Sequence, residues 1–156
     1  MNEPINVAII DDDEEFRQAV CGWLEEMGDI RVVGSASGGS ETIHWLRQMQ
    51  PDVVLIDVGT ASVAEIREVA THAGVIVLHR EGQEPLVLDA FQVGAQGHLD
   101  KQNIRPPQII AAIRAVSRGE VVISPTVAGQ ILDRVVSRMK GENREGPKGA
   151  SGLKQA

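Results

Sequence analysis

Cysteine, positive charge and long apolar runs are all scarce in this chain of 156 residues. Cys21 is the single cysteine, so an internal disulfide is impossible and a reducing compartment is expected. Lysine and arginine together number 15 against 22 acidic residues, which gives a net charge of -7 without a visible basic cluster. Because nucleic acids are bound through basic surfaces, this composition argues against a free-standing nucleic-acid binder.

No apolar run approaches the roughly 20 residues that a membrane-spanning helix needs. The acidic start, residues 1–4, does not resemble a signal peptide. We therefore expect a cytoplasmic protein that does not attach to membranes. Its length suits one domain with a sizeable core, and 42% apolar with 24% charged residues is typical of globular proteins.

Short apolar runs alternate with amphipathic stretches from Ile5 to about Gly119. This alternation is typical of strand–helix units around a parallel sheet. The expected strands cover residues 5–10, 30–33, 53–57, 75–78 and 96–99. The expected helices follow Asp12 and Ser40, cover residues 63–73 and 83–93, and begin again at Pro106. Five strands and five helices predict an α/β fold of flavodoxin-like type, a doubly wound five-stranded parallel sheet with strand order 2-1-3-4-5.

The pattern changes beyond Gly119. Ser124-Pro125 can cap a sixth, extra C-terminal helix whose apolar residues lie four apart. These residues are Val127, Ile131, Val135 and Met139. From residue 141 the chain is rich in glycine and charge without apolar spacing. We expect a main domain over residues 1–123, a helix over 124–140, and a flexible linker or tail over 141–156.

Acidic residues end two of the expected strands, and a lysine follows a third. Asp11 and Asp12 follow the first strand, Asp57 ends the third, and Lys101 follows the fifth. The carboxyl ends of parallel strands share one edge of a sheet, which is where open α/β sheets bind ligands. We therefore place the candidate functional site at this edge.

Charge balance predicts a metal at that edge. Three carboxylates within about 5 Å repel by roughly 3 kcal/mol per pair at an effective dielectric constant near 20. Lys101 supplies one positive charge, and a hard divalent cation would neutralise the remainder. Mg²⁺ prefers a ligand set with few carboxylates, in which water and a phosphate oxygen take the other positions. The sequence therefore predicts an open Mg²⁺ site.

Other ligands of this fold class suit the residues less well. A dinucleotide site needs a Gly-x-Gly-x-x-Gly turn after the first strand, and a flavin phosphate needs hydroxyls and bare amides there. The run Asp11-Asp12-Asp13 would repel both ligands. A hydrolase with Asp57 as nucleophile remains chemically open. It lacks an evident second acid as proton donor, because Val58 follows Asp57.

The acid pair after strand one, the acid after strand three and the lysine after strand five resemble the receiver domain of two-component response regulators. The stretch 90–101, which reads Ala-Phe-Gln-Val-Gly-Ala-Gln-Gly-His-Leu-Asp-Lys, looks like regulators of the NarL/LuxR type. The segment 109–113 and Ser124-Pro125 before a helix add to this likeness. The resemblance covers residues 5–123, so the main domain over 1–123 is expected to be a receiver domain.

The resemblance implies that Asp57 accepts a phosphoryl group from a sensor histidine kinase. Asp12, Asp57 and the backbone carbonyl of Gly59 would hold Mg²⁺, Asp11 would act through water, and Lys101 would bind the phosphate. The phosphoryl group would change the charge at Asp57 from -1 to about -2 and draw nearby donors inward. The surface of the fourth helix, fifth strand and fifth helix would then change shape as a two-state element.

Three features depart from the family pattern. His79 ends the fourth strand where a hydroxyl residue is usual, and His98 replaces the usual aromatic residue. The loop after Asp57 is short, and Gly59 leaves no side chain over the phosphoryl group. His79 could donate to phosphate, best when protonated near its usual pKa of ~6.5, or simply be a hydrogen-bonded strand-end residue. Glu81 could order a hydrolytic water.

We therefore expect a phosphoacceptor signalling domain and not an enzyme. It would control transcription through a DNA-binding output domain outside this chain. A homodimer is expected, through the surface of the fourth helix, fifth strand and fifth helix or through the C-terminal helix. Two alternatives remain open: a pseudo-receiver that binds proteins without phosphorylation, and a Mg²⁺-dependent phosphohydrolase of small molecules.

Overall fold

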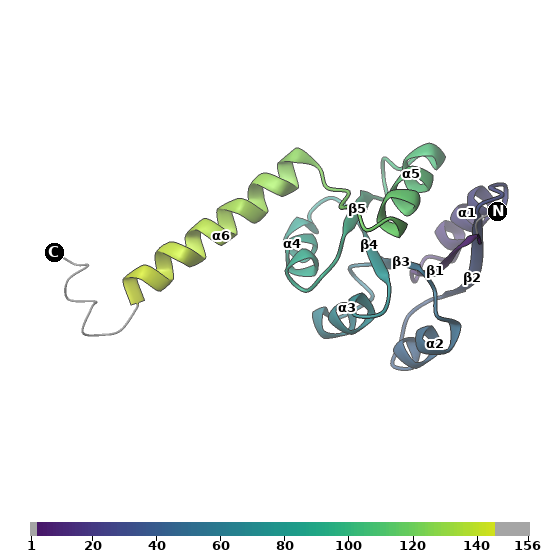
Figure 1. Ribbon diagram of the computed structural model, residues 1–156, viewed down its shortest axis with the longest axis horizontal. Helices are drawn as coiled ribbons and strands as arrows, with labels where there is room; N and C mark the ends of the chain where they lie inside the picture. Colours follow the sequence, from purple (N-terminus) through teal and green to yellow (C-terminus); the bar gives the residue numbers. More distant parts are fainter. Residues whose placement is uncertain (1–2, 146–156) are drawn as a thin grey trace. The chain divides into compact units, whose positions relative to one another are not determined.

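Figure 1 shows the computed structural model, which describes residues 3–145. The chain divides into two compact units between Ile123 and Ser124. Within the described residues, the first unit holds a five-stranded sheet with five helices, and the second holds one helix. No helix in residues 3–145 is both long and apolar enough to cross a membrane.

All neighbouring strands of the sheet run parallel in the order β2-β1-β3-β4-β5. The strands are β1 (Ile5–Ile10), β2 (Ile30–Ala36), β3 (Val53–Asp57), β4 (Gly74–His79) and β5 (Gly97–Asp100). The predicted flavodoxin-like sheet and its strand order are thus confirmed. Strand β2 runs to Ala36, beyond the predicted end at Val33, because it pairs with β1 as far as Ile10.

The helices of the first unit are α1 (Glu14–Glu25), α2 (Thr42–Met49), α3 (Val63–Ala70), α4 (Glu84–Gln92) and α5 (Pro106–Ser117). Local sequence fixes several of their ends. Asp13 caps α1, because its side chain accepts a hydrogen bond from the Phe16 N–H at 3.1 Å. Ser62 and Glu65 form a capping box at the start of α3. Pro106 opens α5 at a position that tolerates a missing N–H.

Helices cover both faces of the sheet (Figure 1). Because side chains alternate along a strand, each strand sends apolar residues to both layers. One face packs against α1 and α5 in a buried core cluster that includes Leu24, Leu55, Ile76, Leu78 and Ile113. The other face is covered by α2, α3 and α4, whose buried residues include Leu46, Ile66, Val69 and Val87. The sheet is therefore buried on both sides, and its functional groups lie at its ends.

Helix α3 is shorter than the predicted span of 63–73. It ends at Ala70, and the Thr71 hydroxyl donates a hydrogen bond of 2.6 Å to the Glu68 carbonyl. This local bond competes with continued helix. The Gly74 N–H then donates to the Asp52 carbonyl at 2.9 Å, which draws the chain into β4.

The second unit contains α6 (Pro125–Glu145). The Val127 N–H donates to the Ser124 hydroxyl oxygen at 3.2 Å, so the predicted cap is present. The helix runs past residue 140, where the sequence predicted its end, so residues 141–145 are helical and not linker. The rest of the predicted tail, residues 146–156, lies outside the described residues.

Candidate functional site

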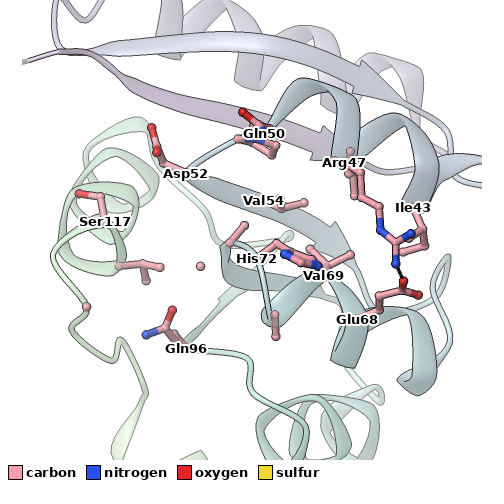
Figure 2. A pocket seen from close by; sticks show the side chains of 17 residues that line it. Ile43, Arg47, Gln50, Asp52, Val54, Glu68, Val69, His72, Gln96 and Ser117 are labelled. Atoms are coloured by element: carbon pink, nitrogen blue, oxygen red, sulfur yellow. Dashed lines mark ion pairs between the residues drawn. The ribbon is translucent and has the colours of Figure 1, made fainter.

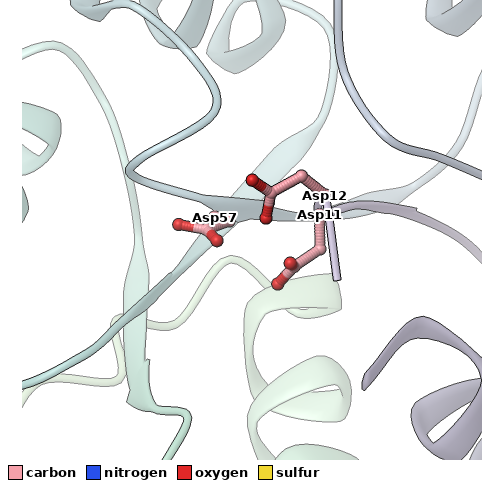
Figure 3. Close-up of side chains that lie close together, drawn as sticks. All are labelled: Asp11, Asp12 and Asp57. Atoms are coloured by element: carbon pink, nitrogen blue, oxygen red, sulfur yellow. The ribbon is translucent and has the colours of Figure 1, made fainter. Parts of the chain in front are cut away.

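The predicted acids converge at the carboxyl ends of β1 and β3. Figure 3 shows the side chains of Asp11, Asp12 and Asp57 side by side. One carboxylate oxygen from each of the three lies within 4.8 Å of the others, close enough to share a metal ion. We call these three residues the acidic cluster. Parallel pairing of β1 with β3 explains the convergence, because Ile10 lies opposite Ile56 and both strands end at the same edge.

Lys101 lies beside the acidic cluster, immediately after β5. Its Nζ atom is 2.7 Å from Asp11 Oδ2 and 3.1 Å from Asp57 Oδ2, and its side chain is only 2% exposed. Nζ also lies 4.8 Å from the centre of the Phe16 ring, a cation–π contact that covers the ammonium group. The Lys101 N–H donates to the His79 carbonyl at 2.8 Å. Both backbone and side chain therefore hold this lysine between two carboxylates.

Asp57 is held by hydrogen bonds from its own loop. Its Oδ1 accepts from the Gly59 N–H at 2.7 Å, and its carbonyl accepts from the Thr60 hydroxyl at 2.9 Å. A Cβ added to Gly59 would lie 3.3 Å from Asp57 Oδ1 and 3.2 Å from Gln83 Nε2. Glycine therefore leaves room directly above the carboxylate. One tenth of the Asp57 side chain remains exposed, so the short loop does not seal it from solvent.

Asp11 and Asp12 differ sharply in exposure. Asp11 is fully buried and accepts a hydrogen bond from the Asp13 N–H at 2.9 Å. Burial raises the pKa of the Asp11 carboxyl and outweighs the lowering effect of Lys101, while the negative charge of Asp57 raises that pKa further. Asp12 is exposed. The acidic cluster therefore has a buried wall at Asp11 and opens to solvent at Asp12.

The residues at this edge fit a hard divalent cation. All three candidate side-chain ligands offer carboxylate oxygens, and one of them faces solvent, where water can complete the coordination. A dication would also offset the desolvation that raises the pKa of Asp11. Mg²⁺ bound here would supply positive charge for a phosphate oxygen and for the acids that hold it.

The two atypical histidines lie together at the ends of β4 and β5. Nε2 of His79 is 3.1 Å from Nδ1 of His98, and the ring centres are 5.3 Å apart. His79 is 8% exposed. Burial, helped by the nearby His79, lowers the pKa of His98 to about 4. The sequence identified both histidines as departures from the family pattern, but it did not predict the hydrogen bond between their rings.

The structure does not add Glu81 to the acidic cluster. Glu81 is exposed, and its backbone N–H donates to Gln102 Oε1 at 3.3 Å. The residue that sequence reasoning missed is Gln83, whose Nε2 approaches Gly59 above Asp57 while its Oε1 accepts from the Arg80 N–H at 2.9 Å. Its position as the first residue of the predicted helix 83–93, shortly after β4, was the available signal.

A separate cleft lies at the opposite, amino end of the strands. It has a volume of about 700 Å³, and Figure 2 shows its lining residues. Asp52 and Gln96, which precede β3 and β5, line it together with the Arg47–Glu68 ion pair that links α2 to α3. The acidic cluster does not contribute to this cleft.

Known proteins resemble this chain in sequence. The family profile described as the response regulator receiver domain matches residues 7–114. The Response regulator UvrY of Escherichia coli K12 is 33% identical over 149 residues, which cover 92% of this chain and 66% of UvrY. The Transcriptional regulatory protein LiaR of Bacillus subtilis is 34% identical over 145 residues, which cover 89% of this chain and 67% of LiaR. The chain thus spans about two thirds of the length of these relatives.

A solved structure supports the same fold. The two-component response regulator of the LuxR family from Aurantimonas sp. SI85-9A1 superposes with a TM-score of 0.72 at 24% identity. The match covers 86% of this chain and 99% of that one.

Proposed function

This chain belongs to the receiver domains of NarL/LuxR-type response regulators, and we propose that Asp57 is its phosphoryl acceptor. The observation that carries the proposal is the position of Lys101 Nζ, 3.1 Å from Asp57 and 2.7 Å from Asp11, in a cluster whose third carboxylate is Asp12. A lysine held there pairs with the carboxylate of the proposed nucleophile and offers a donor to the incoming phosphate.

In the proposed reaction, an Asp57 carboxylate oxygen forms a bond to phosphorus. The bond between phosphorus and the donor atom breaks, and the donor leaves with its electron pair. The donor would be a phosphohistidine of a sensor histidine kinase or a small phosphodonor. Bound Mg²⁺, held by Asp12, Asp57 and the Gly59 carbonyl with Asp11 acting through water, would neutralise charge on the transferring group. Lys101 would contact the same phosphate.

The charge at the site supports reversible signalling and not turnover of substrates. Phosphorylation would convert a carboxylate of charge -1 to a group of about -2 beside a buried ammonium. The described residues around Asp57 offer no buried acid with a free proton for a leaving group, because Asp11 is paired with Lys101. We propose that the chain acts as a phosphoacceptor and not as an enzyme.

We further propose that the phosphorylated chain acts as a dimer in transcription control, through a DNA-binding domain outside these 156 residues. Two surfaces are candidates for the dimer: the surface of α4, β5 and α5, and α6. Helix α6 exposes Leu132 (63%), Val135 (47%), Val136 (46%) and Met139 (58%), an apolar stripe at helical spacing that supports pairing of two copies.

The proposal is tested by incubating the chain with Mg²⁺ and acetyl phosphate and measuring its intact mass. We expect one added phosphoryl group, lost in Asp57→Asn and retained in the control Asp52→Asn at the other end of β3. Parallel addition of beryllofluoride should shift the Gly59 amide resonance. Absence of both the adduct and the shift would favour a pseudo-receiver, and continued release of inorganic phosphate from a range of phosphate esters would favour a hydrolase.

A further inference from the structure

His79 and His98 are joined by a hydrogen bond between their rings, and His98 in turn contacts helix α4. His98 lies opposite Val77 in the pairing of β4 with β5. Because side chains alternate along a strand, His79 and His98 therefore lie on the same face of the sheet. Their ring nitrogens are 3.1 Å apart. The His98 ring in turn makes an edge-on contact with Phe91 of α4, with ring centres 5.9 Å apart.

Backbone hydrogen bonds place the end of β4, where His79 lies, next to the segment that carries Asp57, the proposed phosphoryl acceptor. The residue before it, Leu78, accepts a hydrogen bond of 3.0 Å from the N–H of Val58, which directly follows Asp57. The His79 carbonyl accepts from the Lys101 N–H at 2.8 Å. The second ring nitrogen of His79, Nδ1, is buried without a hydrogen-bond partner. A buried polar atom left unpaired costs on the order of 1–3 kcal/mol, so a phosphate oxygen that reached it would be stabilised.

The proton count of the pair limits what it can do. A neutral imidazole carries one N–H, and its other nitrogen accepts. When His79 carries its proton on Nε2, it donates to His98 Nδ1, and His98 carries its own proton on Nε2. When His79 carries its proton on Nδ1, its Nε2 must accept, and His98 must donate from Nδ1. The tautomer of one histidine therefore fixes the tautomer of the other.

We propose that this pair is a tautomer relay. A phosphoryl group on Asp57 accepts a hydrogen bond from His79 Nδ1, and the protonated nitrogen of His98 consequently changes from Nε2 to Nδ1. One proton passes from His79 Nε2 to His98 Nδ1 along their hydrogen bond. His98 Nε2 releases a proton to water and His79 Nδ1 takes one from water, so the pair keeps its charge. His98 Nε2 changes from donor to acceptor in the ring that contacts α4.

This relay rests on the proposed phosphorylation of Asp57 and adds how the signal reaches α4 in a chain that lacks a hydroxyl at position 79. The low pKa of His98, about 4, supports it, because a neutral His98 must change its tautomer and not its charge. The burial of His79, which is 8% exposed, supports it further, since water competes poorly for a hydrogen bond with a buried partner.

The test uses the whole chain labelled with ¹⁵N, and long-range ¹H–¹⁵N spectra that report which ring nitrogen of each histidine is protonated. The chain has four histidines, so single His→Gln variants assign every signal. His44 and His72 are exposed and serve as internal controls. On addition of Mg²⁺ and beryllofluoride, we expect His79 and His98 to change from the Nε2–H to the Nδ1–H form, with no change at His44 or His72.

Unchanged tautomers at His79 and His98, with beryllofluoride bound as judged by the Gly59 amide, would overturn the relay and leave phosphorylation of Asp57 standing. Absence of any shift at Gly59 would overturn both. A His98→Phe variant gives a second readout, because it keeps a planar ring but cannot exchange a proton. We expect beryllofluoride to bind this variant while the amide shifts across residues 84–100 fall by at least half. Full-sized shifts there would contradict the relay.

Discussion

Strand β3 has an aspartate at each end, and the two side chains differ in exposure and in their partners. Asp52 precedes the strand, is exposed, and accepts a hydrogen bond of 2.8 Å from the Asn6 N–H at the rim of a cleft of about 700 Å³. Asp57 ends the strand, is 7% exposed, and shares a buried lysine with Asp11. The cleft lies beside Asp52, but the buried, ion-paired carboxylate is that of Asp57. The proposed site therefore rests on buried and paired charge and not on cleft volume.

The largest expected effect is the loss of phosphorylation in Asp57→Asn. An amide cannot replace the carboxylate oxygen that attacks phosphorus, so the mass increase after acetyl phosphate treatment should fall below detection. The matched variant Asp52→Asn should be phosphorylated within twofold of the parent chain. An equal loss in both variants would remove the distinction between the two ends of β3.

Lys101→Ala is expected to destabilise the chain and to slow phosphorylation. Removal of the ammonium leaves Asp11 and Asp57 buried without their shared cation, which costs on the order of 3 kcal/mol. Urea denaturation should show this loss, and the rate of adduct formation should drop at least tenfold. Lys140→Ala, on the exposed surface of α6, should change stability by less than about 0.5 kcal/mol. Equal stability of the two variants would contradict the pairing of Lys101.

Asp11→Asn is expected to stabilise the metal-free chain near neutral pH. The folded-state pKa of Asp11 lies above its ordinary value of 3.8, so ionising Asp11 costs folding free energy. That cost is absent below pH 3.8, grows as the pH rises from there to the raised folded-state pKa, and stays constant above it. The variant should therefore be more stable than the parent at pH 7, and this gain should vanish in acid. Urea denaturation at both pH values measures it, and a variant less stable than the parent at pH 7 would oppose this account of Asp11.

The smallest effects are expected at the amino end of the strands. The ion pair of Arg47 with Glu68 has side chains that are 56% and 41% exposed. Exposed pairs contribute about 0–1 kcal/mol, so Arg47→Ala should leave both urea midpoint and phosphorylation close to those of the parent. A loss of phosphorylation comparable to that of Lys101→Ala would show that the two ends of the sheet are coupled.

Much of the acidic cluster could be predicted because it depends only on strand direction. Once β1 and β3 are parallel neighbours, Asp11, Asp12 and Asp57 must share an edge. The His79–His98 bond could not be predicted in this way, since it depends on side-chain rotamers and on the register that places His98 opposite Val77.

Helix ends were the least predictable part of the fold. Helix α3 stops early because of the Thr71 hydroxyl bond, a local detail without a periodic signal. Helix α6 continues past Met139, the last residue of its apolar stripe, because charged residues such as arginine and glutamate are good helix formers even where no apolar stripe is present. Apolar spacing therefore predicts where a helix packs better than where it ends.

The most direct test of the central claim is a Mg²⁺ titration followed by amide resonances. If the acidic cluster holds the ion beside Asp57, the amides of Asp12, Asp13 and Gly59 should shift together and saturably, while that of Asp52 stays constant. The same titration of Asp57→Asn should require at least tenfold more Mg²⁺. Shifts centred on Asp52 and the cleft at the amino end, or a titration that Asp57→Asn leaves unchanged, would contradict the account.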